Sequence, residues 1–105
     1  MEYCDEAVCP YKKLLALLGK AYSFSILRVL SHEGVLRFNE IASEVKGSPK
    51  TITDRLTELV SEGIVKREAF AEIPPRVEYS LTEMGKDLKP IIEHIRTWAV
   101  KWTCK

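Results

Sequence analysis

Hydroxyl and cationic side chains gather at the start of one expected helix, where they have the chemistry to bind phosphate and to read bases. Ser48 and Pro49 begin the segment, which continues with Lys50, Thr51, Thr53 and Arg55. The first backbone N–H groups of a helix have no acceptor within the helix, and they attract phosphate. Hydroxyl and cationic groups beside them suit phosphate oxygens and base edges. We therefore predict that residues 48–55 form the reading end of a DNA-binding helix.

Acidic residues divide this helix into two ends. Asp54 lies within the reading end, and two roles are open to its carboxylate. It can accept a hydrogen bond from cytosine N4, or it can hold Lys50, four residues earlier on the same helix face. Glu58 and Glu62 lie further along, and we expect them to point away from DNA. The plainer alternative is an ordinary surface helix, since Ser-Pro starts many helices.

The helix that must position these residues is expected over residues 49–62. Ser48 suits the N-cap, and Pro49 suits the first helical position because its missing N–H costs nothing there. Apolar residues recur at i, i+4, i+7 and i+8, which predicts one stripe facing the core. These residues are Ile52, Leu56, Leu59 and Val60. Lys50 then points away from the core, whereas Arg55 lies on its flank.

A shorter helix and a tight turn are expected before it, giving a helix-turn-helix over about residues 39–62. Asn39 is the predicted N-cap of the first helix. Gly47 is expected to take a positive φ in the turn. Residues 35–38 are expected to be a short extended segment, the first small strand. Its Arg37 is a further candidate for DNA contact.

Two strands joined by a stiff loop are expected over about residues 64–81, the layout of a wing. They span residues 64–70 and 76–81, and apolar and polar residues alternate in the second. Pro74 and Pro75 exclude the loop from the hydrogen-bonded ladder.

Three cations lie on or beside this hairpin: Lys66, Arg67 and Arg76. Arg76 follows the prolines at the exit of the loop, where it suits a phosphate or a minor-groove edge, so it is the strongest wing candidate. The alternative is a solvated strand whose acidic neighbours neutralise all three cations. Those neighbours are Glu68, Glu72 and Glu78.

The last helix is expected over residues 82–103, capped by Thr82 and bent at Pro90, which removes one internal hydrogen bond. Its apolar residues follow a heptad spacing, typical of a coiled-coil seam. They are Met84, Leu88, Ile91, Ile95, Trp98 and Trp102. The seam predicts a homodimer, whose interface also includes Leu14 and Leu18 of a first helix at residues 9–19. The alternative is that the seam folds back onto its own domain.

Residues 1–105 are expected to form a single winged helix-turn-helix domain. It is mainly α-helical with a small β-hairpin, and its N-terminal and long C-terminal helices serve dimerisation. No apolar run approaches the roughly 18 residues of a membrane span, and the acidic start is unlike a secretory signal, so we expect a cytoplasmic protein with no membrane partner. The net charge is only +1, but the three acidic residues among the first nine leave the rest at +4.

Nothing in the sequence has the pattern of a catalytic site. There is no Gly-rich phosphate loop, and there is no serine, histidine and aspartate in the order of a catalytic triad. Cys4 and Cys9 have no histidine nearby and lack the spacing of zinc ligands. We therefore expect no enzyme, no metal and no cofactor. The serious competitor to binding of double-stranded DNA is a winged helix used as a protein–protein interaction module in a larger assembly.

Together these pieces resemble the HxlR family of winged-helix transcriptional regulators. The resemblance runs from Cys9 to Trp98 and is most specific in residues 37–41, 48–56, 59–65 and 74–82. It implies a dimeric regulator with a layout like that of MarR-type proteins, on a partly palindromic operator. Residues 19–24 depart from the family pattern, which usually has a second glycine before the lysine and a tryptophan in place of Tyr22. No small-molecule effector follows from the sequence.

The chain contains three cysteines: Cys4, Cys9 and Cys104. The resemblance implies a redox role for Cys9, because several members of the family sense oxidants or electrophiles through a cysteine in that position. The positive end of a helix dipole lowers the pKa of a thiol at a helix start. Cys104 lies past the expected last helix and can approach Cys4 or Cys9 of a second copy. The alternative is one small buried residue and two incidental thiols.

Overall fold

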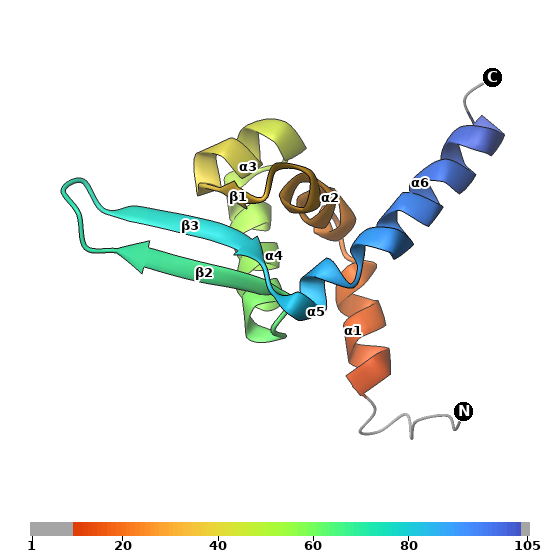
Figure 1. Cartoon of the computed structure of the whole chain (residues 1–105), viewed down its shortest axis with the longest axis horizontal. Helices are drawn as coiled ribbons and strands as arrows, with labels where there is room; N and C mark the ends of the chain where they lie inside the picture. The colour runs from red at the N-terminus through yellow and green to blue at the C-terminus, as the bar shows by residue number, and fades with distance from the viewer. Residues whose placement is uncertain (1–9, 104–105) are drawn as a thin grey trace.

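The computed structural model describes residues 10–103, which form six helices and three strands (Figure 1). In chain order these are α1 (Pro10–Leu18), α2 (Ser23–Glu33), β1 (Val35–Leu36), α3 (Phe38–Val45), α4 (Pro49–Ser61), β2 (Val65–Phe70), β3 (Arg76–Leu81), α5 (Glu83–Lys86) and α6 (Lys89–Thr103). This order confirms the predicted winged helix-turn-helix. No single helix in this range is long and apolar enough to span a membrane.

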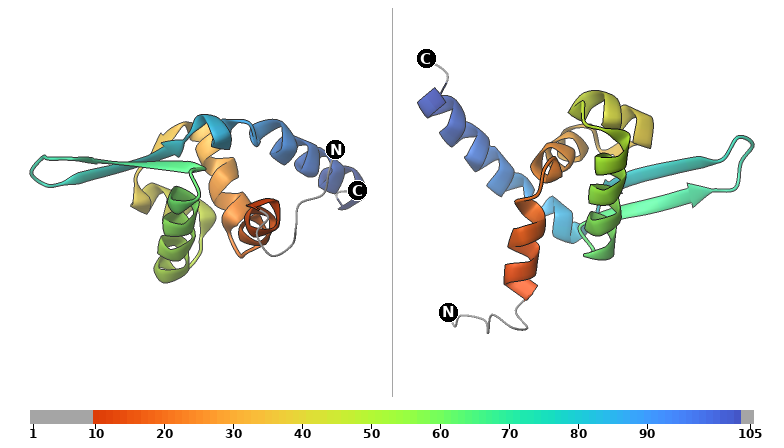
Figure 2. Two further views of the ribbon diagram at one scale, coloured as in Figure 1. Left: turned by 90° about the horizontal axis from the view of Figure 1, so that it is seen from below. Right: turned by 180° about the vertical axis from the view of Figure 1, so that it is seen from behind.

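The wing is a three-stranded antiparallel sheet in the order β1-β3-β2. The register of the hairpin runs from Val65 opposite Leu81 to Phe70 opposite Arg76. The short strand β1 pairs with the other edge of β3, where Leu36 lies opposite Tyr79. Both views in Figure 2 show the hairpin extending away from the helices, with α4 crossing its base.

The central helix α2 packs against most of the other elements. Its buried residues are Ser23, Ile26, Leu27, Val29 and Leu30. They join a core that also contains Ile41 of α3, the α4 residues Ile52, Leu56 and Leu59, and Ile64, Val65 and Leu81 of the wing base. Helices α1 and α2 meet at 86°. The Ser23 hydroxyl donates to the Leu17 carbonyl at 2.7 Å, so the one buried polar side chain at this bend is hydrogen-bonded.

Helix α3 begins two residues earlier than predicted. Arg37, not Asn39, is the N-cap, and the Arg37 backbone N–H donates to Glu40 Oε1 at 2.8 Å. That bond satisfies one of the free N–H groups at the helix start. Phe38 consequently belongs to the helix and packs against the core, rather than ending the first strand.

The turn between α3 and α4 also differs from the prediction. Lys46, not Gly47, takes the left-handed conformation, with φ of 60°. Gly47 is needed for a different reason, because a Cβ there would lie 3.1 Å from the ring of Tyr22. The aromatic side chain of the α1–α2 bend therefore covers the helix-turn-helix turn.

The predicted continuous helix over residues 82–103 is wrong. Thr82 caps a helix as expected, since its Oγ1 accepts from the Gly85 N–H at 3.2 Å, but that helix ends at Lys86. Pro90 is the second residue of the next helix, α6, where a missing N–H costs little. The change of direction thus lies at residues 87–88, before the proline. Gly85 is buried there, and a Cβ on it would clash with the Ile64 carbonyl oxygen.

Candidate nucleic-acid interface

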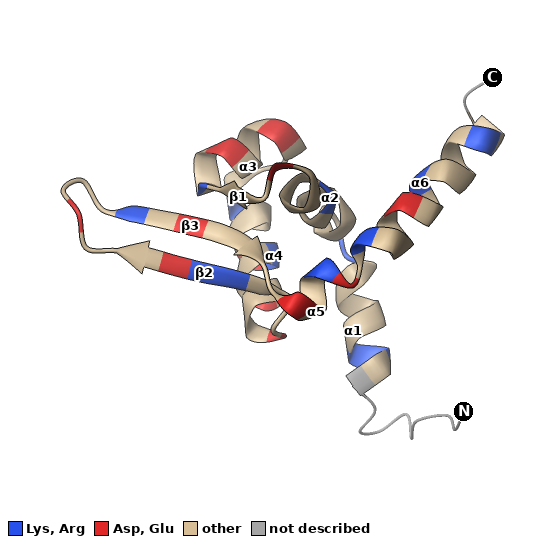
Figure 3. Ribbon diagram, in the orientation of Figure 1, with Lys and Arg blue, Asp and Glu red and all other residues tan. Residues whose placement is uncertain are grey.

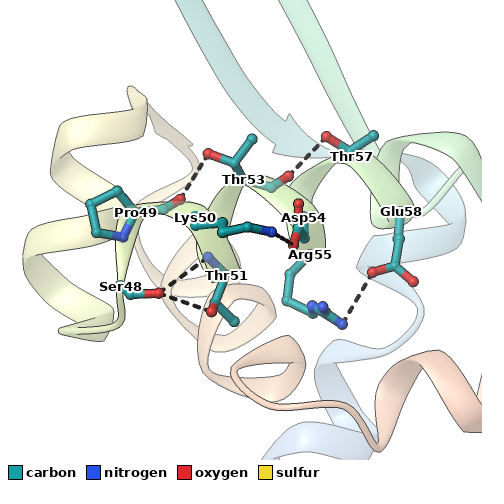
Figure 4. A network of polar contacts seen from close by, with 9 residues as sticks. All are labelled: Ser48, Pro49, Lys50, Thr51, Thr53, Asp54, Arg55, Thr57 and Glu58. Atoms are coloured by element: carbon teal, nitrogen blue, oxygen red, sulfur yellow. Dashed lines mark hydrogen bonds and ion pairs between the residues drawn. The ribbon is translucent and has the colours of Figure 1, made fainter.

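The first turn of α4 is built as the sequence predicts. Ser48 Oγ accepts from the Thr51 N–H at 3.2 Å and donates to Thr51 Oγ1 at 2.9 Å (Figure 4). Pro49 occupies the first helical position. Ser48, Pro49 and Lys50 are exposed, whereas Thr51 is half-buried. The start of α4 is therefore capped by its own side chains and open to solvent.

Threonine hydroxyls on the outer face of α4 bond to the helix itself. Thr53 Oγ1 donates to the Pro49 carbonyl at 2.8 Å, and Thr57 Oγ1 donates to the Thr53 carbonyl at 2.8 Å. Both side chains are exposed. Because each hydroxyl proton is engaged, the outward lone pairs remain as acceptors and the methyl groups as apolar contacts. This face suits base edges that donate hydrogen bonds, and thymine methyl groups.

Lys50 and Asp54 form an exposed ion pair on the same face. Lys50 Nζ lies 3.4 Å from Asp54 Oδ2, and the two side chains are 87% and 48% exposed. Of the two roles open to Asp54, the structure shows the contact with Lys50. Such an exposed pair contributes little free energy, so a phosphate can replace Asp54 as the partner of Lys50 at small cost.

Arg55 turns toward the protein rather than toward the outer face of α4. Its side chain is 14% exposed, and its Nη1 lies 3.1 Å from Glu58 Oε1. Its Nε is buried without a hydrogen-bond partner among the described residues. The sequence predicts Arg55 on the flank of the buried stripe. In the structure its side chain points toward the body of the domain.

The acidic end of α4 faces α1 and the bend that follows it. Lys20 Nζ lies 2.5 Å from Glu58 Oε2, and Lys13 Nζ lies 3.0 Å from Glu62 Oε1. Figure 3 shows this distribution of charge on the ribbon. The two carboxylates expected to point away from DNA are thus held by lysines of another element, and they leave the first half of α4 uncovered.

Arg76 is enclosed within the wing. It lies 3.2 Å from Glu72, 3.6 Å from Glu78 and 4.1 Å from the ring centre of Phe70. Its side chain is 29% exposed. Two carboxylates neutralise it, as the alternative interpretation of the sequence supposed. The hairpin register contained a signal for this enclosure, because a five-residue loop makes Phe70 and Arg76 direct cross-strand neighbours.

Arg67 is the more available cation of the wing. It is exposed on β2, and it forms no ion pair with any other residue in the range 10–103. Lys66, next to it, lies 3.6 Å from Glu68. Arg37 is also exposed, at the start of α3. The prediction ranked Arg76 above Arg67 because Arg76 follows the prolines of the loop, but in the fold Phe70 and two carboxylates enclose Arg76.

The apolar seam of the last helix is mostly uncovered. Ile91, Ile95, Trp98 and Trp102 are 51%, 44%, 65% and 63% exposed. Ile92, which lies between seam positions, is the residue of α6 that enters the core, and Leu88 packs against that core in part. On α1, Leu14 and Leu18 also pack against the core, while Tyr11 and Leu15 are exposed.

The three cysteines, Cys4, Cys9 and Cys104, lie outside the described residues.

Comparison with known proteins gives consistent matches. A family model described as HxlR-like helix-turn-helix matches residues 17–105. YvaP, an uncharacterised HTH-type transcriptional regulator of Bacillus subtilis strain 168, is 40% identical over 97 residues, which are 90% of this chain and 89% of YvaP. The reduced form of the transcriptional regulator YodB from B. subtilis has a TM-score of 0.77 at 34% identity, covering 92% of this chain and 96% of YodB. The redox regulator HypR in its oxidised form has a TM-score of 0.79 at 34% identity, covering 89% of this chain and 96% of the HypR chain.

Proposed function

The chain belongs to the HxlR-like helix-turn-helix family of DNA-binding transcriptional regulators, and we propose that two copies of it read a partly palindromic operator in the cytoplasm. In this proposal the start of α4 enters the major groove and the wing touches the adjacent backbone. Helix-turn-helix proteins read bases mainly with the first turns of the second helix.

The observation that carries the proposal is the uncovered first half of α4. Ser48, Lys50 and Thr53 are exposed on it, and the acidic second half is held against α1 by lysines. The proposed contacts are Lys50 and the capped N-terminus with phosphate, and Thr51 and Thr53 with base edges. Arg55 has a positioning role instead, because its guanidinium faces Glu58.

The exposed seam of α6 supports the proposed homodimer. A row of four large apolar side chains, each at least 44% exposed, is unusual for the surface of a monomer. A second copy with the same seam is self-complementary under twofold symmetry. Two recognition helices would then meet half-sites about one helical turn apart.

Salt-dependent DNA binding tests the function. We expect the full-length protein to bind random duplex DNA at about 50 mM salt and to lose most of that affinity at about 200 mM, because phosphate contacts release counterions. Lys50→Ala should weaken binding, whereas Lys101→Ala, an exposed lysine near the end of α6, should not. Absence of binding at low salt would instead favour a winged helix that binds protein.

A thiol switch is the proposed control of this binding. It is supported by the likeness to the redox regulator HypR and to YodB, whose structures include reduced and diamide-treated forms, and by the place of Cys9 immediately before α1. Diamide should release the wild-type protein from DNA, and Cys9→Ser should remain bound. Cys104→Ser serves as the comparison variant, and equal release of the Cys9→Ser protein and the wild type would contradict a role for Cys9.

A further inference from the structure

Two adjoining hollows lie where α6 leaves the DNA-binding body. The first, of about 490 Å³, lies between the end of α2, the strands β1 and β3 and the α5–α6 junction, and its apolar lining is Leu30, Val35 and Leu81. The second, of about 330 Å³, lies between α2 and the start of α6. They share Ser31 and Lys89. We call these two adjoining hollows together the junction hollow.

Of the four lysine and arginine residues that line the junction hollow, only Lys86 has an ion-pair partner in the described range, Glu83 at 3.5 Å. Arg28, Lys89 and Arg96 line the second part of the hollow and form no ion pair with any described residue. Glu93 is the only acidic residue of the lining, and it lies four residues after Lys89 and three before Arg96, spacings at which helix ion pairs usually form. It makes neither pair. The second part therefore has a net positive charge, with three cations that form no ion pair in the described range and one carboxylate.

Two further features favour a negatively charged occupant with an apolar part. Lys89 is the first residue of α6, a helix of 15 residues whose N-terminal end is the positive end of its dipole. Val35, on the apolar side, is 54% exposed although it belongs to a strand. An occupant that covers Val35 and reaches Lys89 would bury the exposed apolar surface and would give the Lys89 charge a partner.

We propose that the junction hollow binds a small organic carboxylate with an aromatic or aliphatic body. The carboxylate lies between Lys89 and Arg96, and the body lies on Leu30, Val35 and Leu81. A bare inorganic anion would use only the cationic part, and a neutral apolar molecule would use only the other. This site goes beyond the proposed DNA reading and does not depend on it.

Calorimetric titration of the full-length protein without DNA tests the proposal. The probes are 2-naphthoate, the uncharged 2-naphthylmethanol and inorganic phosphate. We expect 2-naphthoate to bind at least about tenfold more tightly than either of the others, since the alcohol loses the charge-assisted hydrogen bonds and phosphate loses the apolar burial. Comparable binding of the alcohol or of phosphate would overturn the proposal, as would no binding of 2-naphthoate.

Variants locate the site. Lys89→Gln should weaken 2-naphthoate binding about tenfold, and Val35→Thr, which keeps the shape and the strand preference of an exposed residue, should weaken it by a smaller factor. Lys101→Gln on the same helix is the matched control and should bind as the wild type does. Unchanged affinity in both Lys89→Gln and Val35→Thr would place the probe elsewhere and overturn the assignment.

Discussion

At the scale of single residues, cations that look alike in the sequence have different surroundings in the fold. Lys50 is 87% exposed and its partner Asp54 is itself about half exposed, so its charge is available to a ligand. Arg55 and Arg76 are held by carboxylates, and each has a buried Nε without a hydrogen-bond partner in the described chain. Arg67 has no such carboxylate neighbour there. Availability for phosphate therefore depends on neighbours, not on residue type.

The two wing arginines should respond differently to truncation. Arg67→Ala should lower DNA affinity evenly across sequences and reduce the slope of log affinity against log salt by about one, because one phosphate contact is lost. Arg76→Ala should mainly destabilise the hairpin, by about 1 kcal/mol, since it loses the stacking on Phe70 and two partly exposed ion pairs. Anisotropy titrations and urea unfolding of both variants measure the two effects. If Arg76→Ala changed the salt slope more than Arg67→Ala did, the roles assigned to the two arginines would be contradicted.

Gly47 is the second residue whose role depends on a neighbour. Gly47→Ala should destabilise the fold by about 1–2 kcal/mol, because the new methyl group meets the Tyr22 ring at 3.1 Å. Tyr22 is partly exposed and can shift, so the cost should be moderate. In a double-mutant cycle read by urea unfolding, Tyr22→Ala should remove most of the penalty. If the penalty persists without the ring, the turn backbone and not the aromatic contact requires the glycine.

At the scale of elements, the α5–α6 region is defined by close packing rather than by local sequence preference. Gly85 is buried with the Ile64 carbonyl directly above it, and Thr82 Oγ1 also bonds backbone carbonyls of the same segment, including Ile64 O at 3.1 Å. These contacts fix the direction of α5. The chain then needs the short break at residues 87–88 before Ile92 can enter the core from α6.

Gly85→Ala should be severely destabilising, by about 3 kcal/mol or more, because the clash is with backbone and not with a flexible side chain. Gly19→Ala is the matched control. Its new Cβ would meet its nearest neighbour, the Leu15 carbonyl oxygen, at an ordinary 3.4 Å, so its stability should change little. Urea unfolding of both proteins compares them, and equal midpoints would refute the close packing at Gly85.

The same elements show which parts of the fold are predictable from the sequence. Helix α4 was predicted closely because Ser48, Pro49 and the apolar stripe are local signals that agree. The break at residues 87–88 was missed because the heptad spacing continues through it, and because Pro90 suits the first turn of a helix as well as a bend. At the candidate site, the outward face of α4 was predictable from helix geometry. The direction of Arg55 was not, because it depends on how its side chain packs against the body. The enclosure of Arg76 had a signal only in the register that places it opposite Phe70.

At the scale of the whole molecule, one face of α6 has no packing partner among residues 10–103. Ile91, Ile95, Trp98 and Trp102 lie on it, and α6 extends away from the body (Figure 1). The only buried residue of α6 is Ile92. The proposed second copy gives the remaining apolar side chains a surface to pack against.

Trp98→Glu should therefore weaken the homodimer without unfolding the monomer, because the side chain is 65% exposed within one chain. A buried, unpaired carboxylate at the seam should cost several kcal/mol, on the order of 3, in association. Sedimentation equilibrium should show monomer at concentrations where the wild type and Trp98→Phe are dimeric. A dimeric Trp98→Glu protein would exclude this face as the interface.

The break at residues 87–88 has a geometric consequence for a twofold pair. Each DNA-binding body is connected to the exposed part of its seam, residues 91–102, through those two residues and the packing of Leu88 and Ile92 on the core, and this connection acts as a joint. When both joints turn by the same angle about an axis perpendicular to the twofold, symmetry makes the two recognition helices turn relative to each other by twice that angle. Half-sites lie on one face of the duplex only at multiples of its helical repeat, about 10.5 base pairs. A small torsion at this joint would therefore move the pair out of phase with its operator while both reading surfaces remain intact.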